Sequence, residues 1–294
     1  MREIKIIVQI DRINFFSDKF IKFYSHFFEK RNIYFLHDEE LIKKIEIKKY
    51  LKKKKFNNNE INIITFDVDI PKKFEDRIKY TTSFLNELQI KLFNENSNIV
   101  LIFPDIDELI IFDDINILQT FEDHLITYPM DVVQNLDIEP EIDFSKNIFD
   151  QRSYYLSPKN PVARWYIKKM IFSKPVDFGD GRHSAVTPKE LNELQKMKWM
   201  VRPNILRKYL NTTENIFGCY LIHLGKIDYN FILKLNEQNL TMYHNFEICQ
   251  NGFTGEKLFG WYKKIHTNIL DNDGDQNLLT IPDHIKDILL SISI

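Results

Sequence analysis

The sequence predicts an α/β fold in which a parallel sheet is flanked by helices, and three observations lead to this prediction. Short apolar runs of strand length alternate with longer stretches of helical periodicity through the first 112 residues. The run Ile99–Phe103 is apolar at every position, as expected for a strand buried on both faces of a parallel sheet. No glycine precedes Gly179, so this half lacks the glycine-rich loops that bind dinucleotides or form P-loops.

The first half alternates strand and helix. A strand is predicted at Ile4–Ile10, followed by a helix with Ser17 as its N-cap and an aromatic face at positions 20, 23, 24, 27 and 28. The next elements are a strand at 33–36, a helix at 39–53, a strand at 61–66, a helix at about 73–94 and the central strand at 99–103. This order predicts a Rossmann-type sheet with right-handed crossovers.

The alternation weakens after Phe112. A helix is expected at 115–125 and a strand at 131–138. The acidic, aromatic stretch 139–160 contains prolines and is expected to be a mobile lid or acceptor loop. Strands are predicted at 165–172 and 217–222, a helix at about 228–238, and two helices with an acidic loop between them in the tail 244–294. The whole is expected to be a mixed sheet flanked by helices, with a helical C-terminal tail.

Composition excludes several classes of protein. The net charge of −2 is not that of a general nucleic-acid binder, and two cysteines make neither a disulfide framework nor a zinc site. No run of about 18 apolar residues is present, so no membrane span is expected.

With no signal-peptide pattern at the start, the expected location is the cytoplasm. The scarcity of alanine beside abundant Ile, Lys, Asn and Phe suggests an AT-rich genome, such as a large virus, in which case the location is the host cytoplasm. The run Lys52–Lys55 is interpreted as a solvated helix end.

The acidic motif after the central strand is the strongest functional signal. Pro104 ends the strand, and Asp105, Asp107 and Glu108 follow it. In extended backbone Asp105 and Asp107 would point the same way, at the carboxyl end of a strand, where open α/β sheets bind ligands. Two carboxylates there suit Mg²⁺ or Mn²⁺ held together with substrate phosphates.

The same Asp-x-Asp spacing occurs at 67–69, 271–273 and 273–275, where an acidic turn is the alternative interpretation. The last two lie in a loop that has Pro282 where a calcium loop needs its closing Glu, so an EF-hand is rejected.

Three further positions are candidate site residues. Asp11 follows the first strand, where it could contact a nucleoside or cap the next helix. Asp180 lies between two glycines and precedes His183, which indicates either a functional loop or a surface hairpin. His223 ends a predicted strand and precedes Gly225 and Lys226, the layout of a phosphate or metal site, although a histidine there can also be structural.

The segment Ile99–Phe112 with its Asp105-Ile106-Asp107-Glu108 motif resembles the DxDE segment of GT-A glycosyltransferases, closest to the family-2-like and family-92-like branches. Gly181-Arg182-His183 is similar to the loop histidine of those families, and the segment Leu221–Lys226 to their histidine–tyrosine block, with Leu224 standing where they often have Tyr. Gln9–Arg12 fits their opening. The resemblance spans roughly residues 4 to 240.

The resemblance implies roles for individual residues. Asp105, Asp107 and His223 would hold Mn²⁺ or Mg²⁺ on the donor diphosphate, and Lys226 would neutralise phosphate. Asp11 would contact the nucleoside. Lys79 is, apart from the resemblance, a further candidate contact to the donor. Asp180 and His183 would line the sugar or acceptor side, and Asp180 is the choice for the general base of an inverting enzyme.

The expected function is therefore metal-dependent transfer of a sugar from a nucleotide sugar, with a UDP-sugar favoured, to a hydroxyl of a glycan or protein acceptor. The expected layout is one domain, 1–294, with a nucleotide-binding half at 1–112, an acceptor and metal half at 113–240 and a helical tail at 241–294. A non-catalytic relative that binds nucleotide sugars or proteins is one alternative. A HAD-type phosphatase is another, but the threonine that usually follows its Asp-x-Asp motif is replaced here by Glu108-Leu109.

Overall fold

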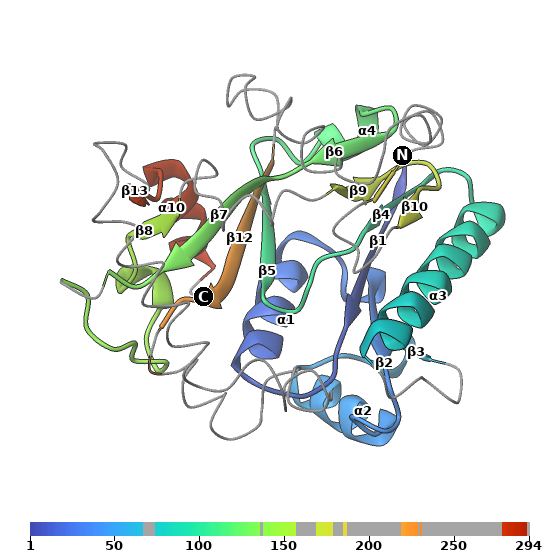
Figure 1. The fold of residues 1–294 in the computed structure, drawn as a ribbon, viewed down its shortest axis with the longest axis horizontal. Helices are drawn as coiled ribbons and strands as arrows, with labels where there is room; N and C mark the ends of the chain where they lie inside the picture. The colour runs from blue at the N-terminus through green and yellow to red at the C-terminus, as the bar shows by residue number, and fades with distance from the viewer. Residues whose placement is uncertain are drawn as a thin grey trace.

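The computed structural model of the 294-residue chain describes residues 1–66, 74–135, 138–156, 169–178, 185–186, 219–228, 230 and 278–292. Within these residues the fold is mixed α/β, with two mixed sheets flanked by helices and a helix near the C-terminus (Figure 1). No helix in the described ranges is long and apolar enough to cross a membrane.

The larger sheet has the strand order β3-β2-β1-β4-β9-β6. Its first four strands are parallel and comprise β1 (Glu3–Gln9), β2 (Ile33–His37), β3 (Asn62–Thr65) and β4 (Ile99–Ile102). Strand β9 (Lys169–Phe172) pairs antiparallel with both β4 and β6 (His124–Ile126). The predicted parallel arrangement is thus confirmed for these four strands, within a sheet that is mixed. Strand β4 is an interior strand with every residue buried, ending two residues before Pro104.

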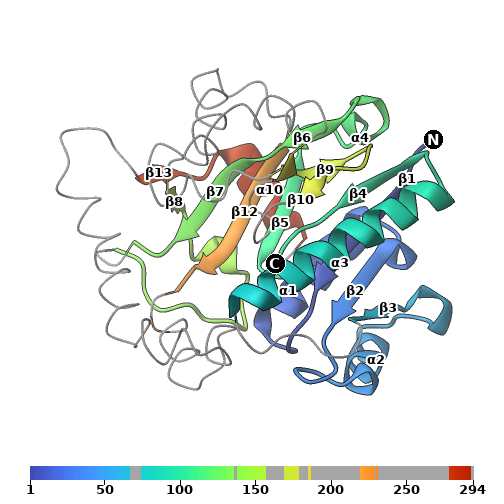
Figure 2. The same cartoon turned by 45° about the vertical axis from the view of Figure 1, so that its right-hand side comes forward.

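Helices cover both faces of this sheet. Successive residues of β1 alternate between two cores, with Ile6 and Val8 in one and Ile7 in the other. The first core contains the aromatic face of α1 (Phe15–Phe27), and the second contains Leu85 and Leu92 of α3 (Phe74–Glu95). Figure 2 shows α3 crossing one face of the larger sheet. The short helix η1 (Lys30–Asn32) lies between α1 and β2. The crossover from β2 to β3 contains α2 (Lys44–Lys53) and η2 (Asn58–Glu60).

Two helix starts differ from the prediction. The N-cap of α1 is Asn14, whose side chain accepts from the Ser17 N–H while the Ser17 hydroxyl accepts from the Asn14 N–H. Ser17 is therefore the third helical residue, whose side chain completes a capping box, and not the N-cap. Helix α2 begins at Lys44, after turns that the side chain of Asp38 stabilises by accepting from the Glu40 N–H.

The second sheet has the order β13-β8-β7-β12-β5. Its strands are β5 (Glu108–Phe112), β7 (Tyr128–Val133), β8 (Tyr154–Leu156), β12 (Cys219–Lys226) and β13 (Leu278–Thr280). Strand β12 runs parallel to β7 and antiparallel to β5. The short helices η3 (Ile148–Asp150) and α10 (Asp283–Ser291) pack beside it, and one core joins β1, α1, β5, β7 and β12.

Several predictions for the second half need correction. The helix expected at 115–125 is only α4 (Ile117–Thr120), because the chain then turns into edge strand β6. The described part of the tail begins with β13 and not a helix. The stretch 139–156, expected to be a mobile lid, instead contains the buried residues Ile148 and Phe149 and strand β8. Its remaining residues, 157–160, lie outside the described ranges.

Candidate metal and donor site

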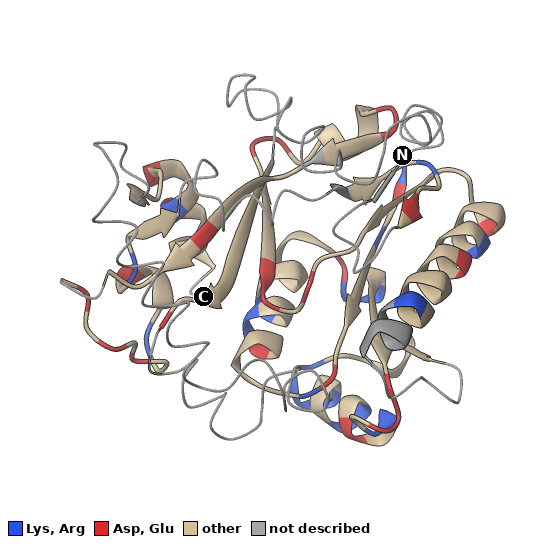
Figure 3. Cartoon of the chain, in the orientation of Figure 1, with Lys and Arg blue, Asp and Glu red and all other residues tan. Residues whose placement is uncertain are grey.

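The candidate site lies where β4 leads into β5, and Figure 3 shows acidic segments at the start of β5 and on β7. Residues 105–108 form a hydrogen-bonded turn, in which the Glu108 N–H donates to the Asp105 carbonyl at 3.0 Å. The fully buried Glu108 carboxylate accepts from the Asp105 N–H at 2.7 Å. The extended backbone expected here is therefore wrong, and Glu108 stabilises the turn that carries Asp105 and Asp107.

A side chain of helix α1, Tyr24, stabilises the same turn through hydrogen bonds to its backbone. The buried Tyr24 hydroxyl donates to the Glu108 carbonyl at 3.3 Å and accepts from the Ile110 N–H at 3.2 Å. Burial, followed by the nearby Glu108 charge, raises the pKa of Tyr24 well above its usual range, so the hydroxyl stays protonated.

The structure brings Asp107 and His223 together. Their Oδ2 and Nε2 atoms are 3.3 Å apart. The reason differs from the one expected, which was that neighbouring parallel strands end at one edge. Strand β12 is antiparallel to β5, so His223 pairs with Glu108 at the start of β5. His223 also lies within β12 and not after its end, because the strand continues to Lys226 with an irregular register beyond His223.

The second ring nitrogen of His223 bonds a residue that the sequence analysis missed. The Asp131 Oδ1 atom, fully buried on β7, accepts from His223 Nδ1 at 2.8 Å. The signal was an aspartate between Met130 and Val132 in an apolar strand, since a buried carboxylate needs a partner. Burial alone would lower the pKa of His223, but the charges and hydrogen bonds of Asp107 and Asp131 outweigh it and raise the pKa to about 9.

Gly225 packs closely against His223 and Asp107. A Cβ atom at Gly225 would lie 2.6 Å from His223 Cε1, 2.8 Å from His223 Nε2 and 3.0 Å from Asp107 Oδ2. The adjacent Leu224 N–H donates to the Asp107 carbonyl at 2.8 Å, which fixes the turn to the end of β12. Glycine at 225 is thus required by close approach to the pair.

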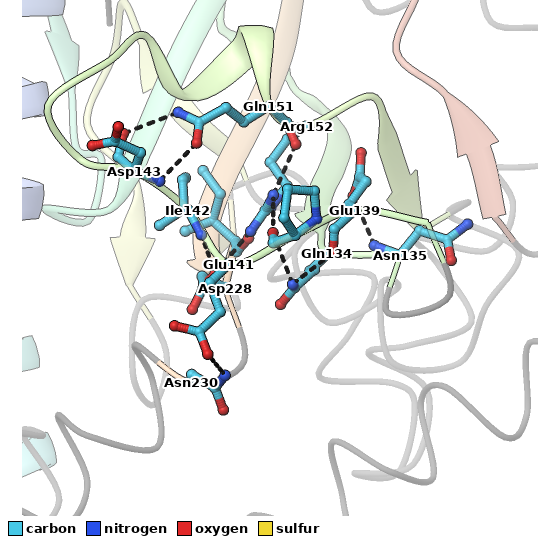
Figure 4. A network of polar contacts seen from close by, with 12 residues as sticks. Gln134, Asn135, Glu139, Glu141, Ile142, Asp143, Gln151, Arg152, Asp228 and Asn230 are labelled. Carbon is cyan, nitrogen blue, oxygen red and sulfur yellow. Dashed lines mark hydrogen bonds and ion pairs between the residues drawn. The ribbon is translucent and has the colours of Figure 1, made fainter.

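A buried ion pair anchors the chain just beyond β12. Arg152, fully buried, donates from Nη2 to Asp228 Oδ2 at 2.8 Å and from Nε to the Ile227 carbonyl at 2.5 Å (Figure 4). The Ile142 N–H also donates to Asp228 Oδ2, and Arg152 Nη1 donates to the Pro140 carbonyl. The segment 139–152 therefore packs against residues 227 and 228 and stabilises the chain just beyond β12.

The other predicted site residues fall in different places. Asp11 follows β1, the neighbour of β4, and accepts from Gln9 Nε2 at 2.9 Å. Because Asn14 caps α1, Asp11 is not its cap. Lys79 is exposed on α3, and Lys226 is the last residue of β12. Asp180 and His183 lie outside the described residues, between β10 (Asp177–Phe178) and β11 (Ala185–Val186), which pair antiparallel as a hairpin requires.

In the part of the chain that the structure describes, no three His, Cys, Asp or Glu side chains form a group able to hold a metal ion. Asp107 and His223 therefore form a pair of candidate metal ligands, and Asp105 does not join them as a third ligand. In comparisons with known proteins, no family model matches the chain, and no curated protein is significantly similar to it.

Proposed function

We propose that the protein is a metal-dependent glycosyltransferase of GT-A type that moves a sugar from a nucleotide sugar, with a UDP-sugar as the first donor to test, to a hydroxyl acceptor. The observation that carries the proposal is the Asp107–His223 pair, backed by Asp131, at the carboxyl end of parallel strand β4. Clefts at this edge of α/β sheets are where such folds bind ligands. The resemblance of the Asp105–Glu108 motif to the DxDE segment supplies the reaction class.

The pair fits a divalent cation. It offers one carboxylate oxygen and one imidazole nitrogen 3.3 Å apart, and a second carboxylate orients the imidazole through its other nitrogen, as in many metal sites. Two protein ligands suit Mn²⁺ or Mg²⁺, which take substrate phosphate oxygens to complete their coordination. When bound, the metal would neutralise the leaving diphosphate.

The chain's own residues then have separable tasks. Asp107 and His223 would hold the cation, Asp131 keeps the His223 ring in place, and Glu108 fixes the turn. The carboxylate of Asp11, beyond the neighbouring strand β1, would contact the nucleoside. Lys79 and Lys226 as donor contacts, and Asp180 and His183 on the acceptor side, belong to the same proposal.

The test is a thermal-shift panel of UDP- and GDP-sugars with and without Mn²⁺, followed by assays of sugar release from each donor. A ligand present at 100 times its Kd stabilises a folded protein by about 2.7 kcal/mol, which is readily measured. We expect a shift that needs both metal and donor, and metal-dependent sugar release. A metal-dependent shift without release over any donor would favour a non-catalytic binding protein, and no shift at all would refute the proposal.

A further inference from the structure

Positive charge is concentrated around α2. Residues 43–55 contain eight lysines and one glutamate, a formal charge of +7, so the rest of the chain carries −9 to give the overall −2. Figure 3 shows blue segments along α2. The charge of the chain is thus unevenly distributed along the sequence, with a strong local excess of lysine at 43–55.

Helix α2 separates its residues into two faces. Ile47, Tyr50 and Leu51 are buried against the sheet. The opposite face carries four exposed lysines, which we call the α2 basic face: Lys48, Lys49, Lys52 and Lys53. Glu46, also exposed, is the one acidic residue of α2 and lies three residues before Lys49. Ile45, 57% exposed, lies three and four residues before Lys48 and Lys49 and therefore on this same face.

The four lysine side chains of the α2 basic face differ from their neighbours in their contacts. The ammonium nitrogen of Lys54 lies 2.7 Å from a carboxylate oxygen of Asp18, and that of Lys43 lies 3.9 Å from a carboxylate oxygen of Glu39. By contrast, within the described residues none of the four side chains forms a hydrogen bond or an ion pair.

Helix stability explains only part of this lysine content. The pairs Lys48–Lys52 and Lys49–Lys53 are four residues apart, where like charges repel and destabilise a helix. Glu46 stands at a favourable spacing from Lys49, and the helix dipole favours Lys52 and Lys53 in the last turn. Neither effect accounts for Lys48.

Neighbouring elements extend the positive surface. Lys30 of η1 donates from Nζ to the carbonyls of Lys54 and Lys55, which brings its charge beside the end of α2. Lys55 has φ 63°, a left-handed conformation that costs a residue other than glycine about 1 kcal/mol or more. It occupies the position after the helix end where glycine is usual, since the N–H of Phe56 donates to the Leu51 carbonyl.

We propose that the α2 basic face docks on a membrane surface rich in anionic lipid headgroups. An anionic headgroup surface attracts a local cluster of lysines, whereas a long nucleic acid would also meet other parts of a chain whose charge outside 43–55 is −9. The α2 basic face has no aromatic residue for base stacking, because Tyr50 is buried and donates its hydroxyl to Asp18. Exposed Ile45 can contact the boundary between headgroups and acyl chains. This inference does not depend on the proposed enzymatic activity.

The test is flotation of the full chain with phosphatidylcholine vesicles containing 0, 10 or 30% phosphatidylserine. We expect binding only with phosphatidylserine, and weaker binding as NaCl rises from 50 to 500 mM. Each lysine near an anionic surface contributes about fivefold to binding, so Lys48→Gln/Lys49→Gln/Lys52→Gln should lower the partition coefficient roughly 100-fold. The charge-preserving triple Lys→Arg variant should bind like the parent.

The matched control is Lys91→Gln/Lys146→Gln/Lys174→Gln, which removes the same charge from exposed lysines outside the α2 basic face. It should change the partition coefficient by less than about threefold. Equal losses in both triple variants, or no binding of the parent at 30% phosphatidylserine and 50 mM NaCl, would overturn the proposal. The proposal would also be overturned if the parent bound a single-stranded or duplex oligonucleotide more tightly than vesicles at the same salt and the Lys48→Gln/Lys49→Gln/Lys52→Gln variant lost that oligonucleotide binding. Circular dichroism should show all variants folded, since removing like charges relieves repulsion in α2.

Discussion

His223 sits between two carboxylates, and this single arrangement sets how the metal-free protein responds to pH. Its pKa is raised to about 9 from an ordinary 6.5, so the folded state binds the proton more tightly than the unfolded state. The resulting stability is fully present below about pH 6.5 and is lost as the pH rises through about 9. A divalent cation would have to displace this proton, which couples metal binding to pH.

We therefore expect the free energy of unfolding in EDTA to fall by up to roughly 3 kcal/mol between pH 6.5 and 9.5, because one pKa unit corresponds to about 1.4 kcal/mol. Urea titrations at several pH values measure it. The decrease should shrink in Asp107→Asn, which removes a charge 3.3 Å from the ring. It should persist in His284→Asn, whose histidine is 58% exposed. An unchanged pH slope in Asp107→Asn would contradict the assignment.

Asp107→Asn also tests the proposed chemistry. The substitution keeps the size of the side chain but removes the charge that would hold the cation, so sugar release and the Mn²⁺-dependent thermal shift should both be lost. The fold should persist, because the side chain is 24% exposed at the end of a turn. Near-normal transfer by this variant, or outright unfolding, would remove Asp107 from the metal site.

Gly225→Ala probes the close packing over the pair. The new Cβ would lie 2.6 Å from His223 Cε1, so either the ring or the backbone must move, at a cost of about 1–3 kcal/mol. Metal-dependent stabilisation should weaken along with the pH slope of unfolding. Thr280→Ala, at an exposed position of β13, is the control and should leave both unchanged. If Gly225→Ala behaves like this control, the close packing of residue 225 against His223 and Asp107 is not needed for metal binding or for the pH dependence of unfolding.

At the scale of elements, the sequence predicted local structure better than pairing. The apolar runs that became β2 and β4 are continuous, and the burial of every residue of β4 leaves such a run few alternatives. The runs of β1 and β3 are interrupted by polar residues but are of strand length. The antiparallel pairing of β5 with β12 joins residues more than 100 positions apart, and no local pattern encodes it. His223 was thus correctly placed beside Asp107 for the wrong reason. The Asp131 and Glu108 contacts were missed because their partners depend on that pairing and on the turn.

The segment 139–152 shows the same limit. The prolines and acids of the stretch 139–160 suggested a loose loop, whereas Arg152 and Asp228 hold its residues 139–152 beside the end of β12. Removing one partner of a buried ion pair leaves an uncompensated charge, so Arg152→Met should cost about 3–5 kcal/mol in urea unfolding. Arg152→Met/Asp228→Asn should recover part of that loss, and the double-mutant cycle measures the coupling. Additive losses would show that the two side chains do not act as a pair.

At the scale of the molecule, the two sheets share one core. This core contains Val8 of the larger sheet and Leu221 of the second sheet, both fully buried. A continuous core predicts that the sheets unfold together, as expected for a single cooperative unit, even though they pair through different strands. The sequence also predicts one domain, because no clear domain boundary is visible in it.

Val8→Ala and Leu221→Ala test this cooperativity, since each leaves a cavity in the common core. A truncation of this kind costs about 1–3 kcal/mol for Val and 2–5 kcal/mol for Leu. Hydrogen exchange measured by mass spectrometry should show global opening in peptides from β1 and β12, and either substitution should accelerate that opening equally in both peptides. Lys91→Ala, at an exposed position of α3, should change neither. If Val8→Ala accelerates exchange only in β1 peptides and Leu221→Ala only in β12 peptides, the two sheets are separate folding units.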